Sequence, residues 1–393
     1  VLHQIKSDNG TILTAWRTAY NAISIINDIL DRLENTSVSF SSDELLNRIK
    51  AEALFVRSLI YYNLIQAFGD VPFPLKVVSV SESYSYLRED KKEIYSHIIS
   101  DLLSCKEHLP EVYQGKDIGR ITTYAASSIL AKIYLTIGEK DLAKIELKRI
   151  VDSGKYSLDS NNDGVVDVKD YEYLFLPDTK NCRESILEIQ YLSGVDNVNA
   201  QHQNQYTPFL WSFHLPGSSE TFRGGGKNTP SKDLISEYEE NDPRKEISII
   251  FGYQDEGANI WVDHPYTNKF YDPNWQNPGQ NFEIIRYADI LLLYSEVTGD
   301  ASYLNQVRAR VGLSPFGSDL YPKNYNTLAL AVEHERRVEL AFEFHRFFDL
   351  VRNGRALEVF NGKGFNLSEN DIQFPIPLVE IDINPALNQN PGY

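Results

Sequence analysis

The chain has 393 residues, of which 42% are hydrophobic and 24% charged, a composition typical of a globular protein with a large core. Its formal net charge of −17 argues against nucleic-acid binding, which needs a basic surface, and against electrostatic attachment to anionic lipid. Aromatic side chains are numerous, with 24 Tyr, 19 Phe and 4 Trp, so we expect some to pack the interior and others to stack on flat apolar faces of a ligand.

The two cysteines, Cys105 and Cys182, form neither a metal-binding spacing nor a CxxC redox motif. No apolar run reaches the length of a membrane-spanning helix, and no segment resembles a signal peptide. The chain begins at Val1 and contains no Met, which indicates a processed or trimmed form.

The N-terminal part, residues 1–153, is expected to be a series of helices joined by short turns. Apolar residues at helical spacing predict helices over residues 11–35, 43–68, 91–108, 125–138 and 139–153. Ser42 or Asp43 can cap the second helix, and the GDVPFP segment after it breaks helical structure. Paired helices with short turns and small residues at their contacts predict tetratricopeptide-like hairpins.

Residues 159–170, DSNNDGVVDVKD, match a calcium-binding loop, with oxygen side chains at loop positions 1, 3, 5, 9 and 12 and Gly at position 6. Position 12 is Asp instead of the usual bidentate Glu, which predicts a weaker site. The alternative is a polar turn without metal, so a structural calcium ion is the one cofactor that the sequence suggests. The candidate ligands are Asp159, Asn161, Asp163, Asp167 and Asp170, with the carbonyl of Val165.

Residues 154–283 form a loop-rich part. Its segment 190–282 is rich in Gly, Asn, Gln, Pro, Tyr and Trp and holds short strand-like pieces, such as Ser248–Tyr253 and Asn259–Val262. A long irregular segment between helical blocks is usually functional or disordered, and the aromatic content argues against disorder. We therefore expect ligand contacts here.

The C-terminal part, residues 284–393, returns to helix over 286–297, 301–313 and 333–354 and ends in an extended tail, 374–393. Residues 333–354 are predicted to form one long amphipathic helix. Exposed charge pairs contribute only ~0.2–0.5 kcal/mol each, so its dense charges indicate either a packed polar network or residues that hold neighbouring segments. We expect the following to brace the tail and the 286–297 helix: Glu335, Arg336, Arg337, Glu339, Arg346, Asp349 and Arg352.

No catalytic motif is evident. The chain lacks HExxH, and GSS at 217–219 is no nucleophile elbow. GGG at 224–226 is followed by Lys227, but Asn228 stands where a phosphate-binding loop needs Ser or Thr. A glycosidase with paired carboxylates stays open because Asp and Glu are abundant, although no local motif selects a pair. We expect a protein that is not an enzyme.

Motifs along nearly the whole chain resemble one family in the expected order. They are AEALFVRSLIYYNLIQAFGDVPFPL, GRITTYAASSILAKIYL, RYADILLLYSEV, LNQVRARVGL, ERRVELAFEFHRFFDLVRNG and PIPLVEIDINPALNQNPGY. Together they resemble the SusD/RagB-like nutrient-binding outer-membrane lipoproteins of Bacteroidetes.

The resemblance implies a single, mainly α domain over residues 1–393, an α-α superhelix of tetratricopeptide-like hairpins with a large loop-rich insert and a few short strands. It implies a protein on the extracellular face of the outer membrane, held by a lipid anchor that is absent from this chain. The implied partner is a SusC-like TonB-dependent transporter, which receives the ligand, usually an oligosaccharide and sometimes a peptide. An oxidising compartment also makes a Cys105–Cys182 disulfide more plausible.

Ligand-binding loops vary within the family, so we nominate contact residues on physical grounds. Sugar rings present C–H faces that stack on aromatic planes, while amide and guanidinium groups hydrogen-bond hydroxyls. For each aromatic residue the alternative is packing in the core or in a loop. The aromatic candidates are Trp211, Trp261, Trp275, Tyr206, Tyr271, Tyr84 and Tyr86, and the polar candidates are Asn204, Asn274 and Arg223.

Overall fold

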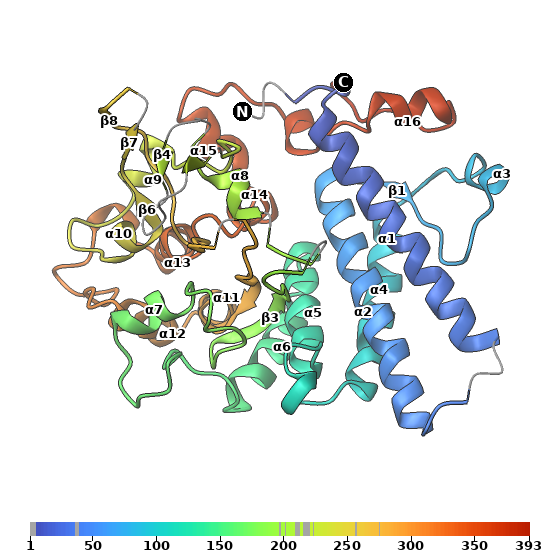
Figure 1. The fold of residues 1–393 in the computed structure, drawn as a ribbon, viewed down its shortest axis with the longest axis horizontal. Helices are drawn as coiled ribbons and strands as arrows, with labels where there is room; N and C mark the ends of the chain where they lie inside the picture. The colour runs from blue at the N-terminus through green and yellow to red at the C-terminus, as the bar shows by residue number, and fades with distance from the viewer. Residues whose placement is uncertain are drawn as a thin grey trace. The chain divides into compact units, whose positions relative to one another are not determined.

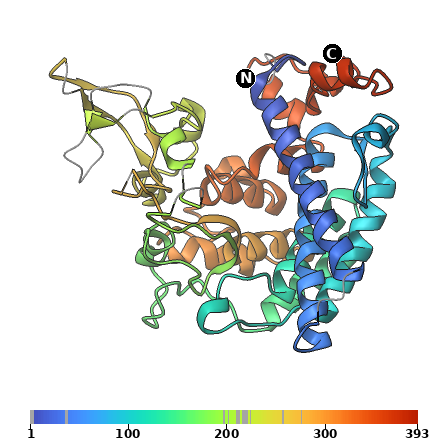
Figure 2. The same ribbon diagram turned by 45° about the vertical axis from the view of Figure 1, so that its right-hand side comes forward.

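The structure is a computed structural model that describes residues 5–35, 39–195, 198–200, 202–208, 213–214, 221–222, 224–255, 258–274 and 276–393. It is mainly α-helical, as predicted, with short strands (Figures 1 and 2). The chain divides into two compact units. Unit 1 comprises Val1–Tyr113, Arg120–Ala143 and Phe347–Tyr393, and unit 2 comprises Gln114–Gly119 and Lys144–Arg346. The single domain expected over residues 1–393 stays a prediction.

Unit 1 is built on four helices, in which α2 packs against α1 and α4, and α4 packs against α5 (Figure 1). They are α1 (Gly10–Asn35), α2 (Asp43–Phe68), α4 (Lys91–His108) and α5 (Thr123–Ile137), and they confirm the predicted helices to within two residues. Between α2 and α4, the strand β1 (Val71–Pro72) pairs antiparallel with β2 (Arg88–Glu89), and α3 (Val80–Ser83) lies in the connection.

Local sequence explains where these helices begin, and one buried arginine ties them together. Ser42 caps α2, because its side chain accepts a hydrogen bond from the backbone N–H of Leu45 at 3.2 Å. The Arg57 guanidinium of α2 donates to Asn27 Oδ1 of α1 at 3.0 Å and to Asp101 Oδ2 of α4 at 3.1 Å. A single side chain therefore joins three helices of the unit.

The C-terminal tail completes unit 1. Its elements are most of α14 (Arg346–Arg352), then α15 (Ala356–Asn361), a 3-10 turn η4 (Glu369–Ile372) and α16 (Leu378–Ile383). Arg88 donates to the backbone carbonyl of Asn388 at 2.8 Å, and Arg17 pairs with Glu380 at 2.7 Å. Asn390 Nδ2 donates to the carbonyl of Phe68 at 2.8 Å, so the tail satisfies a backbone group at the end of α2.

Unit 2 contains most of α6 (Lys140–Asp152) and a second set of helices. Its core lies between α11, α12 and α13 and includes Leu291, Leu304 and Val332. These helices are α7 (Val168–Tyr173), α8 (His202–Tyr206), α9 (Lys232–Ile235), α10 (Arg244–Ser248), α11 (Tyr287–Thr298), α12 (Ala301–Arg310) and α13 (Leu328–Glu339), with 3-10 turns η2 (Gly115–Asp117) and η3 (Lys323–Tyr325).

The strands of unit 2 are short and antiparallel. β3 (Ser185–Ile189) pairs with β10 (Phe282–Arg286), which leads directly into α11. A four-stranded sheet has the order β5-β4-β7-β8, and β6 pairs with β9. These strands are β4 (Phe213–His214), β5 (Thr221–Phe222), β6 (Ile249–Ile250), β7 (Tyr253–Asp255), β8 (Ile260–Val262) and β9 (Tyr266–Thr267).

The prediction of one helix over residues 333–354 is wrong. Helix α13 ends at Glu339, and α14 begins only at Arg346. In a continuous helix the carbonyl of Glu339 would accept the N–H of Glu343. Here it accepts bonds from Lys269 Nζ and Arg286 Nη2, each at 2.7 Å, and the Glu343 N–H bonds Leu340 instead. Distant cations therefore end the helix.

Two further findings concern the cysteines and the membrane. Cys105 and Cys182 are both free, so the disulfide that the resemblance made plausible is not formed. Cys105 is buried, and its Sγ donates to the carbonyl of Ala51 at 3.1 Å. In the described part of the chain, no helix has the length and apolar character needed to cross a membrane.

Candidate functional site

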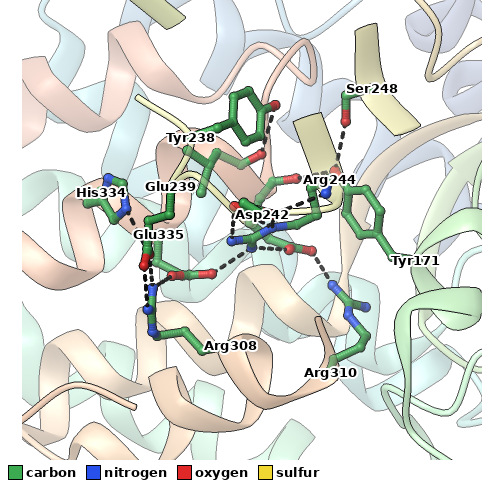
Figure 3. A network of polar contacts seen from close by, with 12 residues as sticks. Tyr171, Tyr238, Glu239, Asp242, Arg244, Ser248, Arg308, Arg310, His334 and Glu335 are labelled. Carbon is green, nitrogen blue, oxygen red and sulfur yellow. Dashed lines mark hydrogen bonds and ion pairs between the residues drawn. The ribbon is translucent and has the colours of Figure 1, made fainter. Parts of the chain in front are cut away.

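Unit 2 encloses a network of buried ion pairs around the C-terminal half of α13 (Figure 3). Arg244, at the start of α10, donates through Nη1 to Glu335 Oε1 at 2.6 Å and to Glu339 Oε2 at 2.8 Å. Its Nη2 also bonds Asp242 Oδ2 at 2.7 Å. Arg308 of α12 reaches the other oxygen of Glu335 at 2.8 Å. Four arginines of the network are at most 1% exposed: Arg244, Arg286, Arg308 and Arg310.

Glu339 is the hub of this network. Its Oε1 accepts from both Arg286 and Arg310, and the same two arginines also bind Glu184 of the segment before β3, at 2.8 and 2.5 Å. Burial alone would raise the pKa of Glu339, but the charges of Arg310, Arg286 and Arg244 outweigh it and hold the pKa well below its usual range. The carboxylate is therefore ionised at neutral pH, and both of its oxygens accept bonds from arginines.

A buried lysine extends the network. Lys269 Nζ donates to Glu343 Oε1 at 2.7 Å and lies 5.1 and 4.8 Å from the ring centres of Tyr171 and Phe175. Burial lowers the pKa of Lys269 to about 8, although Glu343 opposes this shift.

The dense charges after residue 333 thus form a packed polar network, which was one of the two alternatives. They also hold a neighbouring helix, as predicted, because Arg336 bonds Asp289 Oδ1 of α11 at 2.5 Å. In unit 1, Arg17 and Arg88 bond the tail, and Asn390 of the tail bonds the end of α2. Bracing of the tail by the charged residues after 333 stays a prediction.

Trp261 is the most exposed of the described aromatic candidates for ligand contact. It lies in β8 opposite Gln254 of β7, and 63% of it is exposed. Part of the ring lies over the backbone of Gly252, where an added Cβ would come within 2.5 Å of the indole. The glycine thus lets the indole lie close against the sheet while the rest of its surface faces solvent.

Tyr206 and Asn204 lie on the short helix α8, which the GGG segment holds in place. The backbone N–H groups of Gly225 and Lys227 donate to the carbonyls of Asn204 and Gln205, at 2.8 and 2.7 Å. A Cβ at Gly225 would meet the Gln205 backbone at 2.8 Å, so the glycine permits a close backbone approach. The GGG segment, which is followed by a lysine as in a phosphate-binding loop, therefore packs against the backbone of α8.

Of the other described candidates, Tyr271 and Asn274 contact other residues of the protein, and Tyr84 and Tyr86 lie in unit 1. Tyr271 packs against the buried pair Tyr253 and Tyr266. Asn274 Nδ2 donates to Ser193 Oγ at 2.9 Å, which ties two loops together. In unit 1, Tyr84 is 49% exposed beside α3 and Tyr86 is half-buried.

Three nominated residues, Trp211, Trp275 and Arg223, lie outside the described residues. The others fall into separate groups: the α3 connection of unit 1, helix α8, the β7–β8 hairpin and the loop of Asn274. Their roles as ligand contacts stay predictions.

The predicted calcium loop is closed by its own side chains. The Asp159 carboxylate accepts the N–H groups of Asp163 and Gly164 at 3.1 and 3.3 Å, and Asp170 Oδ1 accepts that of Asn161 at 3.1 Å. Arg183 also lies 3.4 Å from Asp159. Among the described residues, no group of three or more His, Cys, Asp or Glu side chains is arranged to hold a metal. Calcium binding through Asp159, Asn161, Asp163, Val165, Asp167 and Asp170 stays a prediction.

Calcium, if bound, should stabilise the fold. We expect calcium at 100 times its Kd to add about 2.7 kcal/mol to the free energy of unfolding, seen as a higher melting temperature than in EDTA. The Asp163→Ala variant should lose this response, while Asp178→Ala, an exposed position beyond the loop, should keep it. Equal melting curves in calcium and EDTA would identify a metal-free polar turn.

One exposed aromatic residue escaped the sequence-based prediction. Phe344 was placed in the interior of a helix, but it lies in the turn after α13, is 57% exposed and has a φ of 63°. Its ring contacts Tyr206 and Phe282 at 6.3 and 6.0 Å between centres. No signal in the sequence marked it, because the break in the helix depends on distant residues.

Comparison with known proteins places this helical fold in one class. Residues 1–135 match the family model described as "Starch-binding associating with outer membrane", and residues 252–393 match the SusD family model. The SusD-like protein P2 of Formosa agariphila is 26% identical over 98% of this chain and 81% of its own length.

Solved structures agree. A SusD superfamily protein from Parabacteroides distasonis superposes with a TM-score of 0.81 at 26% identity, covering 99% of this chain and 87% of that chain. A laminarin-binding SusD-like protein superposes with a TM-score of 0.79 at 27% identity, covering 97% and 86%. The class is thus a mainly α SusD-like fold. The chain belongs to the SusD/RagB-like family.

Proposed function

We propose that this chain binds an oligosaccharide at the cell surface and delivers it to a SusC-like TonB-dependent transporter. The observation that carries the proposal is the likeness, over 97% of the chain, to a laminarin-binding SusD-like protein. The exposed indole of Trp261 agrees with it, since such a ring can stack on the apolar face of a sugar. In this proposal a lipid anchor that precedes this chain holds it at the outer face of the outer membrane.

Binding without bond cleavage fits the buried carboxylates. Glu335, Glu339 and Glu343 are each bonded to buried cations and are at most 4% exposed, so a glycosidic bond could not reach them. Glu188 of β3 and Glu283 of β10 lie opposite each other as a cross-strand pair of carboxylates. Both are at most 6% exposed, so a sugar could not reach them, and they suit a glycosidase poorly.

Titration calorimetry with laminarin and a panel of neutral and acidic oligosaccharides tests the proposal. We expect a Kd in the micromolar to millimolar range for at least one glycan, with the glycan recovered intact by chromatography. Trp261→Ala should weaken that binding about tenfold, and Tyr84→Ala in unit 1 provides a comparison at another exposed aromatic.

Other outcomes separate the alternatives. Binding of peptides with no glycan binding would favour a peptide or another nutrient as the cargo. Shortened glycan products would indicate a hydrolase. Co-purification with a TonB-dependent barrel from outer membranes would test the delivery role.

A further inference from the structure

We propose that Phe344, stacked on Phe282 and flanked by Tyr206, forms an aromatic platform that binds the apolar face of a neutral pyranose ring. This inference rests on the proposed glycan-binding function and assigns a site for it. All three residues belong to unit 2.

The platform is the outer end of a stack of three rings. Phe270 and Phe282 lie 4.7 Å apart with an interplanar angle of 20°, and Phe282 and Phe344 lie 6.0 Å apart at 30°. Exposure rises along the stack from 2% at Phe270 to 8% at Phe282 and 57% at Phe344. Since one face of the outermost ring is covered by Phe282, the exposed surface of Phe344 includes its opposite face.

The backbone at Phe344 shows that this exposure has a cost. Phe344 has a φ of 63°, in the left-handed region that residues with a Cβ rarely adopt. The neighbouring Phe342 has a φ of 72°, but its side chain is buried among Tyr238, Phe270 and Phe282, which offsets the strain. Phe344 lacks that compensation, because most of its ring faces solvent. Strain of this kind at an exposed residue is typical of functional positions.

Neighbouring groups give the platform a second wall and polar contacts. The Tyr206 ring lies 6.3 Å from that of Phe344 at an angle of 51°, so the two rings form an open corner. Burial raises the pKa of Tyr206 to about 12, so its hydroxyl stays protonated and can donate to a sugar oxygen. Gln205, which is exposed and precedes Tyr206 in the chain, carries amide donors and an acceptor.

The surroundings favour a neutral ligand. His202, at the start of α8, packs against Phe270 and Phe282 at 5.5 and 5.4 Å. Burial lowers its pKa to about 4, so it is uncharged at neutral pH. A ring such as glucopyranose, with equatorial hydroxyls and C–H groups on its faces, matches a flat uncharged aromatic surface with polar groups at its edge.

The left-handed backbone makes a sharp test possible. Phe344→Gly removes the ring and also relieves the strain, so the variant should melt at a higher temperature than the wild type while binding glycan at least tenfold more weakly. Phe344→Tyr keeps a flat ring and should bind within about threefold of the wild type. Binding is measured by calorimetry with laminarin oligosaccharides and the same glycan panel.

Each outcome decides between the two proposals. If the wild type and Phe344→Gly bind a glycan equally, the platform is overturned while the glycan-binding function stands, and loss of binding in Trp261→Ala alone would place the site on β8. If the wild type binds no glycan, both proposals fail. If Phe344→Gly melts at a lower temperature, the ring serves the fold and the platform is overturned.

Discussion

Replacing Glu339 with Gln should lower the free energy of unfolding by about 3–5 kcal/mol, the largest loss that we expect from any single substitution in this chain. Glu339 accepts bonds from Arg244, Arg286 and Arg310, all at most 1% exposed. The amide keeps the shape of the side chain but removes the charge that compensates these cations. Buried arginines left without that charge cannot regain their hydration in the folded state. Urea unfolding followed by circular dichroism measures the loss.

The matched control is Glu333→Gln on the same helix. Glu333 pairs with Arg346 at 3.1 Å where both side chains are partly exposed, so the loss should be about 1 kcal/mol or less. Equal losses in the two variants would show that the buried network is not a special source of stability. Glycan binding of any Glu339→Gln protein that stays folded should match the wild type.

Glu339 should also make the protein sensitive to acid. Its folded pKa lies well below that of the unfolded chain, so its contribution is fully present above the unfolded value of about 4.3 and is lost as pH falls towards the folded pKa. Between pH 6 and pH 3, the stability difference between wild type and Glu339→Gln should therefore shrink.

Replacing Glu283 with Gln should have the opposite sign and raise the free energy of unfolding at neutral pH by about 1–3 kcal/mol. Glu283 of β10 lies directly opposite Glu188 of β3, and both are buried. Burial raises the pKa of Glu283 well above its usual range, and the charge of Glu188 raises it further. The amide removes the like-charge conflict but can still accept the bond from Ser185 Oγ, which is 3.0 Å long.

The pH dependence distinguishes this cause from simple repacking. Because the folded pKa of Glu283 is raised, Glu283 does not lower the free energy of unfolding of the wild type below its unfolded pKa of about 4.3. The free energy of unfolding then falls as pH rises from this value towards the folded pKa. The gain in Glu283→Gln should therefore grow from pH 4 to pH 8. A gain independent of pH would contradict the argument.

Glu188→Gln is the matched control on the opposite strand. Both oxygens of Glu188 accept bonds, from the Asn181 N–H at 2.8 Å and from Asn281 Nδ2 at 2.6 Å. An amide has only one acceptor oxygen, so this variant should gain less stability than Glu283→Gln, or lose some.

Local patterns predicted the helices of unit 1 well, because capping by Ser42 and apolar periodicity act within a few turns of chain. The end of α13 was beyond reach, because its cause, capture of the Glu339 carbonyl by Lys269 and Arg286, comes from residues 70 and 53 positions earlier. The exposure of Phe344 could not be predicted for the same reason, because it follows from the same break in the helix. Composition pointed to exposed aromatic residues in the loop-rich part, and Trp261 is one, but only the folded chain brings Phe344 beside Tyr206.

The way in which the tail completes unit 1 has a consequence for biosynthesis. The carbonyl of Phe68 at the end of α2 is satisfied by Asn390, which lies 322 residues later and leaves the ribosome roughly 16–64 s afterwards at ordinary elongation rates. Residues 144–346 of unit 2 emerge entirely within that interval. The Phe68 carbonyl at the end of α2 therefore stays without its Asn390 partner while unit 2 is synthesised. A chaperone can bind the end of α2 during that time.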